Sequence, residues 1–369
     1  MDKKIRVLVV DDSAFMRKAM EMMLADVDDI QIVDSAKNGQ ECIEKIKLHN
    51  PDVVTLDIEM PVMDGLTALK IIMKECPVPV IMLSSLTSDG AEATIEALNL
   101  GAVDFIPKQM SFVSLEIVRI KDDLVEKIRY FATNKMILMR KIFGQKPSLT
   151  SRPAVSDKQI PVPSRETVKD KQQAIHELPL TIKNSTEIVV IGSSTGGPAA
   201  LQKVIPQLPA NFPLPVLLVQ HMPPAFTKSL ADRLDSLSKV KVVEATDGEM
   251  LKPGCVYISP GNKHMIIKNK GQITLSDYPV STLHKPSVDV MMDSVYEVYG
   301  RKVVAVIMTG MGQDGTLALE KLAKAGAYII GQDEESCVVY GMPKKPNELG
   351  YSKVITSVDR ISDEIVKGI

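Results

Sequence analysis

Short runs of consecutive apolar residues recur along this chain, and each is followed by polar, acidic or glycine-rich residues. Such runs are typical of strands that are buried on both faces, as in parallel sheets covered by helices. The runs lie at 5–10, 53–56, 80–83, 103–107, 187–191, 215–220 and 303–308. The pattern therefore predicts an α/β protein with two separate groups of parallel strands.

The stretch between the two groups changes character along its length. Helical periodicity over about 121–143 predicts an amphipathic helix. Its apolar positions are Leu124, Ile128, Phe131 and Met136. From 145 to about 186 the chain is polar and proline-rich, which predicts a flexible tether. Because 369 residues exceed what one core usually supports, we expect domains at 1–125 and 187–369, joined by a helical extension and linker at 126–186.

The first apolar run of the second domain ends in Gly192-Ser193-Ser194-Thr195-Gly196. A Gly-x-Ser-x-Gly turn between a strand and a helix exposes its serine, so that Ser194 Oγ could act as a nucleophile. The next amide, Thr195, could then point at a developing oxyanion. A glycine-rich phosphate cradle or an ordinary turn would give the same pattern, so other residues must decide between these readings.

A histidine and an aspartate also follow apolar runs of the second domain. His221 comes directly after the run at 215–220, and Asp314 lies in the glycine-rich turn after the run at 303–308. Because the carboxyl ends of parallel strands share one edge of a sheet, we expect Ser194, His221 and Asp314 to meet in one crevice. A serine, a histidine base and an orienting carboxylate together indicate ester hydrolysis.

Two further histidines follow the serine and compete for the role of the base. His264 enters a strand and His284 lies in a polar loop, so neither is expected at a strand end, although either could line the cleft. The order Ser, His, Asp along the chain differs from that of the α/β-hydrolases and of the familiar serine proteases. The position directly after a predicted strand favours His221 as the base. The chain order indicates that this triad would be an independent use of the same chemistry.

Polar side chains also end the strands of the first domain. They are Asp11, Asp12, Asp57, Ser84 and Lys108. Three carboxylates in one crevice offer the oxygen ligands that Mg²⁺ prefers, and a hydroxyl and an ammonium would support a phosphoryl group on Asp57. Each acid alone could instead cap a helix or a turn. Their joint spacing favours a phosphoacceptor, Asp57, with Asp11, Asp12 and Asp57 as metal ligands and with Ser84 and Lys108 as support.

These residues carry two family resemblances that together cover nearly all of the chain except the linker. Residues 1 to about 125 resemble a two-component receiver domain through Asp11-Asp12, Asp57, Met60-Pro61-x-Met63-Asp64-Gly65, Ser84 and Lys108. Residues from about 187 to 369 resemble the catalytic domain of the chemotaxis protein-glutamate methylesterase family, CheB. That resemblance rests on Gly192-Ser193-Ser194-Thr195-Gly196-Gly197, Gln220-His221-Met222-Pro223, Pro260-Gly261-Asn262-Lys263-His264-Met265, Pro286-Ser287-Val288-Asp289 and Thr309-Gly310-Met311-Gly312-x-Asp314-Gly315.

The resemblance implies both a fold and roles for residues. The fold is a flavodoxin-like receiver with a five-stranded parallel sheet, followed by a doubly wound, mostly parallel α/β methylesterase domain. By resemblance, Ser194, His221 and Asp314 form the catalytic triad, and the amides near Thr195 and Met311 bind the oxyanion. Asp57 corresponds to the phosphorylated aspartate. Receivers commonly have proline after the site lysine, whereas Gln109 follows Lys108 here, so we expect a differently shaped lysine loop.

The resemblance also implies a function. The chain is expected to be a phosphorylation-activated hydrolase that demethylates glutamate methyl esters on methyl-accepting chemotaxis receptors, releases methanol and deamidates specific glutamines. A chemotaxis histidine kinase would supply the phosphoryl group, Mg²⁺ would serve the receiver, and the ester chemistry would need no cofactor. An unphosphorylated receiver packed over the Ser194 crevice would obstruct the substrate. The alternative is a phospho-regulated nucleotide- or protein-binding module without catalysis; against a dinucleotide site, the second strand ends in Gln220-His221 and not in an acid.

Charge and composition narrow the classes of partner. A net charge of −2, with acids and bases mixed throughout, gives no basic surface for nucleic acid. No apolar run reaches membrane-spanning length, so we expect a cytoplasmic protein without direct membrane insertion. The four cysteines are scattered without the spacing of metal ligands, which favours inert thiols.

Overall fold

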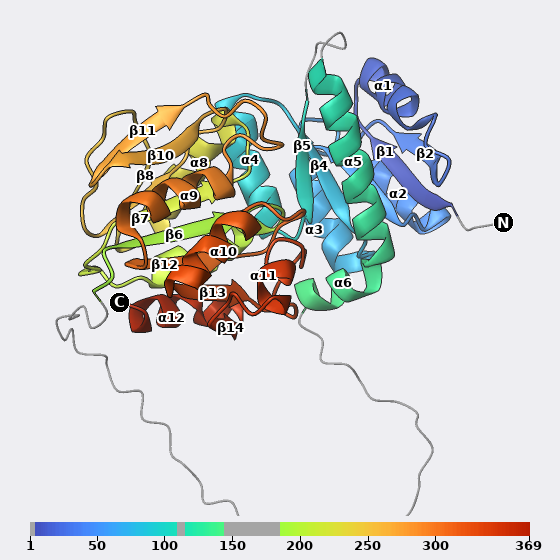
Figure 1. The fold of residues 1–369 in the computed structure, drawn as a ribbon. Coiled ribbons are helices and arrows are strands. Elements are labelled where there is room, and N and C mark those ends of the chain that lie inside the picture. The colour runs from blue at the N-terminus through green and yellow to red at the C-terminus, as the bar shows by residue number, and fades with distance from the viewer. Residues whose placement is uncertain (1–3, 109–114, 144–184) are drawn as a thin grey trace, which may run out of the picture.

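The structure, a computed structural model, describes residues 4–108, 115–143 and 185–369. Figure 1 shows two α/β domains side by side, with the amino-terminal domain in blue to teal and the carboxyl-terminal domain in yellow-green to red. Gln109 and residues 144–184 lie outside the described residues, and with them lie the expected change in the lysine loop and most of the expected tether.

The first domain is built on a five-stranded parallel sheet with the order β2-β1-β3-β4-β5. Its strands are β1 (Ile5–Val10), β2 (Ile30–Ala36), β3 (Val53–Asp57), β4 (Val80–Ser84) and β5 (Asp104–Pro107). Its helices are α1 (Ala14–Leu24), α2 (Gly39–His49), α3 (Gly65–Glu75), α4 (Ser88–Asn99) and α5 (Leu115–Thr133). Strands β3 and β4 are buried along their whole length, as continuous apolar runs predict for strands covered on both faces.

The second domain has a seven-stranded parallel sheet with the order β14-β13-β12-β6-β7-β9-β8, and an antiparallel hairpin. The sheet strands are β6 (Ile188–Ser193), β7 (Val216–Gln220), β8 (Lys241–Glu244), β9 (Cys255–Ile258), β12 (Val303–Ile307), β13 (Tyr328–Gln332) and β14 (Val354–Thr356). The hairpin is β10 (His264–Asn269) and β11 (Gln272–Ser276). The helices are α7 (Gly197–Val204), α8 (Pro224–Leu237), α9 (Val288–Tyr299), α10 (Thr316–Ala325), α11 (Lys344–Glu348) and α12 (Ile361–Lys367), with 3₁₀ turns η1 (Ile205–Gln207) and η2 (Val358–Arg360).

The order of the second sheet decides where its functional residues meet. Strand β6 lies between β12 and β7 and is parallel to both. The chain leaves β6 to one side to form β7 and later returns on the other side to form β12, so the loops after these strands diverge from one point of the sheet edge. Ligands bind at such a switch point in open α/β sheets. Both the predicted fold class and the shared strand edge are confirmed.

The amphipathic region after the first domain consists of two helices and not one. Helix α5 ends at Thr133, and α6 (Lys135–Phe143) begins after Asn134, whose side-chain amide donates to the Tyr130 carbonyl. Leu124, Ile128 and Phe131 are buried as predicted. Met136 is 68% exposed, and Leu138 is buried in its place, because the break restarts the helical register.

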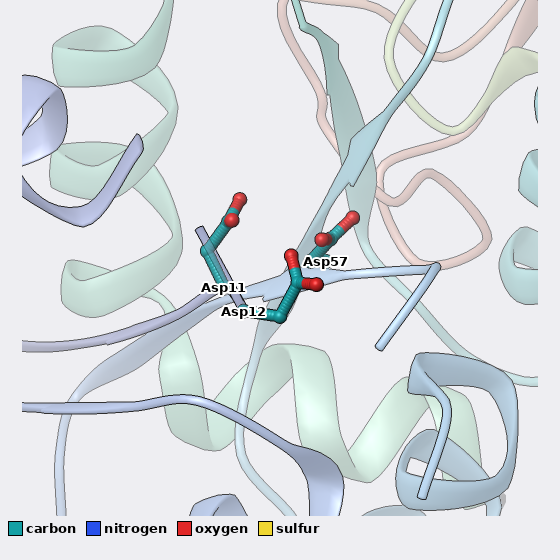
Figure 2. Close-up of side chains that lie close together, drawn as sticks. All are labelled: Asp11, Asp12 and Asp57. Carbon is teal, nitrogen blue, oxygen red and sulfur yellow. The ribbon is translucent and has the colours of Figure 1, made fainter. Parts of the chain in front are cut away.

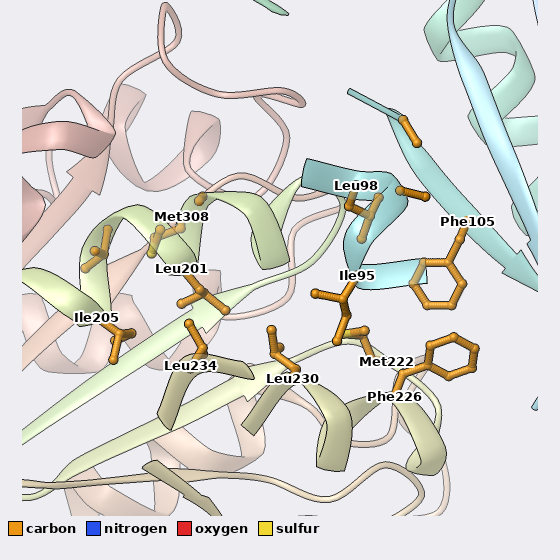
Figure 3. Packing of buried hydrophobic residues seen from close by; sticks show 14 of the residues in the cluster. Ile95, Leu98, Phe105, Leu201, Ile205, Met222, Phe226, Leu230, Leu234 and Met308 are labelled. Carbon is orange, nitrogen blue, oxygen red and sulfur yellow. The ribbon is translucent and has the colours of Figure 1, made fainter. Parts of the chain in front are cut away.

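The two domains pack through an apolar contact between α4 and β5 on one side and α7 and α8 on the other. Figure 3 shows Ile95 of α4 and Phe105 of β5 close to Met222 and Phe226. The rings of Phe105 and Phe226 stack with centroids 4.6 Å apart. Beside them, the side-chain amides of Asn99 and Gln202 exchange hydrogen bonds of 3.0 and 2.8 Å. The first domain therefore contacts the second domain next to the loop that follows β7.

Among the helices that the structure describes, none combines the length and the apolar character needed to cross a bilayer.

Candidate active site and phosphoacceptor site

Ser194 lies at the turn between β6 and α7. The Ser194 N–H donates to the Thr309 carbonyl at 3.0 Å, and the Gly197 N–H donates to the Ser194 carbonyl at 2.8 Å. The turn requires glycine at 196, where φ is +75° and a Cβ atom would lie 2.6 Å from the Val338 Cβ. Ser193 is buried and donates to Gln220 at 2.7 Å, so Ser194 is the serine of this pair that is partly exposed.

His221 and Asp314 form a direct pair. His221 Nε2 lies 2.8 Å from Asp314 Oδ2, and the two side chains are only 8% and 10% exposed. The Asp314 carboxylate also accepts hydrogen bonds from the Ser287 hydroxyl and from the amides of Val288 and Asp289, at the amino terminus of α9. Burial alone would raise the pKa of Asp314, but the hydrogen bonds from His221 and these amides hold that pKa well below its usual range. The carboxylate is thus charged and fixed.

The pairing selects the tautomer of the histidine. Because Nε2 faces a carboxylate, it carries the proton, and Nδ1 keeps the lone pair. His221 Nδ1 is buried and has no hydrogen-bond partner among the described residues. The structure therefore brings His221 and Asp314 together as predicted, while no hydrogen bond joins Ser194 to His221 in the described part of the chain.

The turn after β12 lies directly against the serine. A Cβ atom on Gly310 would lie 2.7 Å from the Ser194 Cβ, so only glycine permits this approach. The next residue is Met311. Within the described residues, the backbone N–H groups of Thr195 and Met311 donate to no other group. Two unused amides beside a serine are the components from which an oxyanion site is built.

A buried ionic network of the first domain reaches this turn. The Thr195 hydroxyl donates to Asp104 Oδ2 at 2.9 Å. Lys127 of α5 lies 3.0 Å from both Asp104 and Asp123, and it donates to the Phe105 carbonyl at 3.1 Å. Burial would lower the pKa of Lys127, but the two carboxylates hold it above its usual range. A charged group of the first domain thus holds the residue next to the candidate nucleophile.

His284 lies against the candidate base: the sequence left open that it could line the cleft, but did not predict a contact with His221. Its ring stacks on His221 with centroids 4.1 Å apart and an angle of 19° between the planes. Burial, and then the neighbouring His221, lowers the pKa of His284 to about 4. The polar loop that carries His284 does not follow a strand, so the sequence carries no strand-end signal for it. The loop does lead into Pro286-Ser287, directly before α9, and this was the available indication that it lies near the site. His264 is fully buried and lies outside the triad, although it supports the same loop.

The first domain brings its three acids together. Figure 2 shows the carboxylates of Asp11, Asp12 and Asp57 grouped at the strand ends, and one oxygen from each lies within 4.8 Å of the others. Lys108 Nζ is 2.8 Å from Asp11 and 2.6 Å from Asp57. Burial, opposed by Lys108, raises the pKa of Asp57 to about 6. Three carboxylates at this spacing fit Mg²⁺, which takes oxygen ligands.

Ser84 ends β4 next to Asp57, but its hydroxyl is directed elsewhere. It donates to the Gly90 carbonyl at 3.0 Å and accepts from Thr94 at 2.7 Å, so helix α4 holds it. Of the predicted support residues, Lys108 contacts Asp57 and Ser84 does not hydrogen-bond to it in the described arrangement. A move of Ser84 toward Asp57 would break its contacts with α4, the helix that packs on the second domain.

Comparisons with known proteins show the family of the chain. Residues 189–365 match the family described as CheB methylesterase, and residues 7–118 match the response regulator receiver domain. A protein-glutamate methylesterase/protein-glutamine glutaminase 1 of Oleidesulfovibrio alaskensis is 46% identical, over 99% of both chains. A protein-glutamate methylesterase/protein-glutamine glutaminase of Thermotoga maritima is 44% identical, also over 99% of both chains.

Solved structures resemble each half of the chain separately. The crystal structure of the Thermotoga maritima CheB methylesterase catalytic domain is 47% identical, with a TM-score of 0.48, and covers 50% of this chain and 99% of its own. The response regulator domain of Thermotoga maritima CheB is 50% identical, with a TM-score of 0.33, and covers 36% of this chain and 98% of its own.

Proposed function

Since the chain belongs to the CheB methylesterase family and carries an amino-terminal response regulator receiver domain, we propose that Ser194, His221 and Asp314 carry out its hydrolysis. The chain is a protein-glutamate methylesterase and protein-glutamine glutaminase under phosphorylation control. The observation that carries the proposed triad is the buried His221–Asp314 pair, 2.8 Å long, beside the serine turn. A nucleotide- or protein-binding module would not need that pair.

The proposed reaction has two steps. His221 Nδ1 takes the proton of Ser194, whose oxygen bonds to the carbonyl carbon of a glutamate γ-methyl ester. The tetrahedral intermediate collapses, the bond to the methoxy group breaks, and methanol leaves with the proton from His221. Water, activated by the same nitrogen, then cleaves the acyl-enzyme to glutamate and free Ser194. Asp314 keeps the imidazole in the required tautomer throughout.

The amides of Thr195 and Met311 would bind the oxyanion of each intermediate. Both N–H groups lie in the turns that flank Ser194 and donate to no other group among the described residues. Preorganised donors of this kind contribute roughly 10²–10³-fold each to the rate in serine hydrolases. Attack on a glutamine side chain by the same groups would release ammonia, which accounts for the second activity of the family. The ester chemistry as proposed uses no cofactor.

The substrate class and the phosphodonor follow from the family. A protein-glutamate methylesterase of this kind acts on chemoreceptors, and a receiver domain takes its phosphoryl group from a histidine kinase. We propose methylated glutamates of methyl-accepting chemotaxis receptors as the substrate and a chemotaxis histidine kinase as the donor. The chain would then adjust receptor methylation during sensory adaptation, in the cytoplasm and without inserting into the membrane or binding nucleic acid.

Phosphorylation would act on Asp57. Asp11, Asp12 and Asp57 would hold Mg²⁺, which a receiver typically needs for phosphorylation, and Lys108 would neutralise phosphoryl charge. Ser84 would reach the phosphoryl group by leaving its contacts with α4. We keep the division into a receiver at 1–125, an extension and linker at 126–186 and a catalytic domain at 187–369; helix α5 crosses the first boundary.

The receiver would inhibit the esterase by covering it. Its face formed by α4 and β5 packs on α7 and α8, and Asp104 holds Thr195, so a bulky protein substrate meets the receiver at the site. Strand β5 carries Asp104 and Phe105, and Lys108 follows it directly. A phosphoryl group that attracts the Lys108 ammonium would therefore disturb the contacts that hold the domains together. The population of the state with separated domains would then rise.

Methanol release from a methylated receptor tests the proposal. The full chain and its Ser194→Ala variant are compared, each with and without Mg²⁺ and a small-molecule phosphodonor. We expect release that rises with the phosphodonor and that falls by about 10³-fold or more in the variant. Activity that persists in Ser194→Ala would rule out the triad.

A further inference from the structure

The loop between β11 and α9, residues 277–286, is fixed from beneath by a buried histidine. His264 is fully buried; its Nε2 donates to the Pro279 carbonyl at 3.1 Å, and its Nδ1 accepts from the Ser287 N–H at 3.2 Å. At the start of the loop, Asp277 pairs with Lys263 at 2.6 Å and with Lys285 at 3.6 Å. Both ends of the loop are thus held in place, and its charged groups are paired with one another.

The same loop directs large apolar side chains outward. Tyr278, Val280 and Leu283 are 75%, 64% and 83% exposed. A single exposed apolar residue is normal on a protein surface, but several close together indicate a binding surface. These three lie within six residues of one held loop, so they contribute little to the core and form what we call the rim surface, defined as Tyr278, Val280 and Leu283.

The rim surface is continuous with the active site along the chain. His284 follows Leu283 directly, and its ring stacks on the candidate base His221 at 4.1 Å. Ser287, three residues further on, donates to Asp314 at 2.9 Å. One short segment therefore carries both the support of the His221–Asp314 pair and the exposed apolar side chains.

We propose that the rim surface binds the helix that presents the esterified glutamate, which rests on the function proposed above. A glutamate side chain is only a few bonds long, so the backbone of a protein substrate must lie against the edge of the site. Residues three and four positions away lie on the same face of a helix, one turn from the glutamate. Because the charged groups of the loop are paired, the expected partner offers apolar side chains at those positions. The rim surface thus selects an amphipathic helix.

Comparing a protein substrate with a small one tests the inference. The variant combines Tyr278→Ser, Val280→Ser and Leu283→Ser in the full chain, assayed with Mg²⁺ and a phosphodonor. We expect KM for methylated receptor to rise about tenfold, as loss of a few apolar contacts would cause, with kcat nearly unchanged. Hydrolysis of a free glutamate γ-methyl ester should change less than twofold. The control is Ile355→Ser, which removes an apolar side chain that is 50% exposed from β14, away from the loop.

Each other outcome overturns the inference. An equal loss on both substrates would mean that the loop acts through His221, and no loss on either would mean that the rim surface binds nothing. A rise in activity without the phosphodonor would mean that the receiver covers the rim surface. A loss of dimers in analytical sedimentation would mean that a second copy of this chain covers it. Failure of the proposed function looks different, since Ser194→Ala would then retain activity on the receptor.

Discussion

Asp314 shows how one carboxylate can serve two structural purposes at once. It orients His221, and it also caps helix α9 through the amides of Val288 and Asp289. Asp289, in the first turn of α9, accepts in turn from the Ala318 amide of α10, so an acid at or just before the start of each helix binds an amide at the start of the other. Reciprocal capping fixes the carboxylate without any need for a rigid turn at Asp314 itself. Gly310, earlier in the same turn, is the glycine that allows the close approach to Ser194.

The burial of His284 predicts a pH dependence of stability. Its pKa is about 4 in the folded protein and 6.5 in an unfolded chain. Between these values the unfolded chain binds more protons, so the free energy of unfolding falls as the pH falls from about 6.5 to 4. Relative to His284→Gln, which cannot titrate, the natural chain should lose roughly 3 kcal/mol by pH 4. Urea unfolding at several pH values measures this, and parallel curves for the two proteins would contradict it.

At the scale of elements, the sequence predicted the strands that bear chemistry better than the others. Strands β3, β4, β6, β7 and β12 consist mainly of apolar residues, and the predicted runs end close to where these strands end in the structure. Strand β2 has Gln31, Asp34 and Ser35 among its residues, so its composition does not distinguish it from a loop. The break at Asn134 was not predicted either, because a side-chain hydrogen bond and not a helix-breaking residue accompanies it.

In the candidate site, too, the sequence predicted the residues that follow strands and missed those that depend on contacts between loops. Ser194 and His221 directly follow strands and Asp314 lies in the turn after β12, so parallel pairing brings these three segments to one edge of the sheet. His284 reaches the site through a loop whose path depends on contacts with His264, some twenty residues earlier in the chain. No local pattern encodes such a contact. Ser84 likewise ends the predicted strand, but its rotamer is set by Thr94 of α4.

The turn between β6 and α7 gives a prediction that separates the cost of a positive φ from the cost of a steric clash. Gly196 and Gly350 both have positive φ, +75° and +73°, but only at Gly196 would a Cβ atom meet a neighbour, Val338, at 2.6 Å. Gly350→Ala should cost about 1 kcal/mol for its backbone conformation alone and leave activity intact. Gly196→Ala should cost more and lower kcat at least tenfold, because relief of the clash moves the Ser194 turn. Thermal unfolding and methanol release measure both variants, and equal behaviour of the two would refute the argument.

At the scale of the whole molecule, β5 connects the two sites. Asp104 holds Thr195 beside the candidate nucleophile, Phe105 stacks on Phe226 of α8, and Lys108 pairs with Asp57, the candidate phosphoacceptor. Two residues of one strand therefore contact the second domain, and the lysine directly after that strand contacts the candidate phosphoacceptor. A change of charge at Asp57 can affect the domain contact directly, because the end of β5 and the residues of that contact are separated by a few residues. This arrangement lets a local electrostatic change alter the contact between whole domains.

Domain contact can be weakened without touching either site. Asn99 and Gln202 exchange two hydrogen bonds at the edge of the interface, with Arg233 3.2 Å from Gln202. Asn99→Lys with Gln202→Lys would place two ammonium groups beside that guanidinium, where like charges repel by about 1 kcal/mol or more each. We expect activity without phosphodonor to rise several-fold, and to rise less at high salt because ions screen the repulsion.

The matched control has the same number of substitutions, but its two new charges attract each other. Asn99→Glu with Gln202→Lys places opposite charges at the same positions, so the unphosphorylated activity should stay at or below that of the natural chain. Methanol release at low and high ionic strength compares the variants, and small-angle scattering reports whether the domains separate. If both double variants gave the same activity, the α4–α7 contact would not restrain the esterase. Inhibition would then depend on the Asp104–Thr195 bond and the stacked Phe105 and Phe226 rings alone.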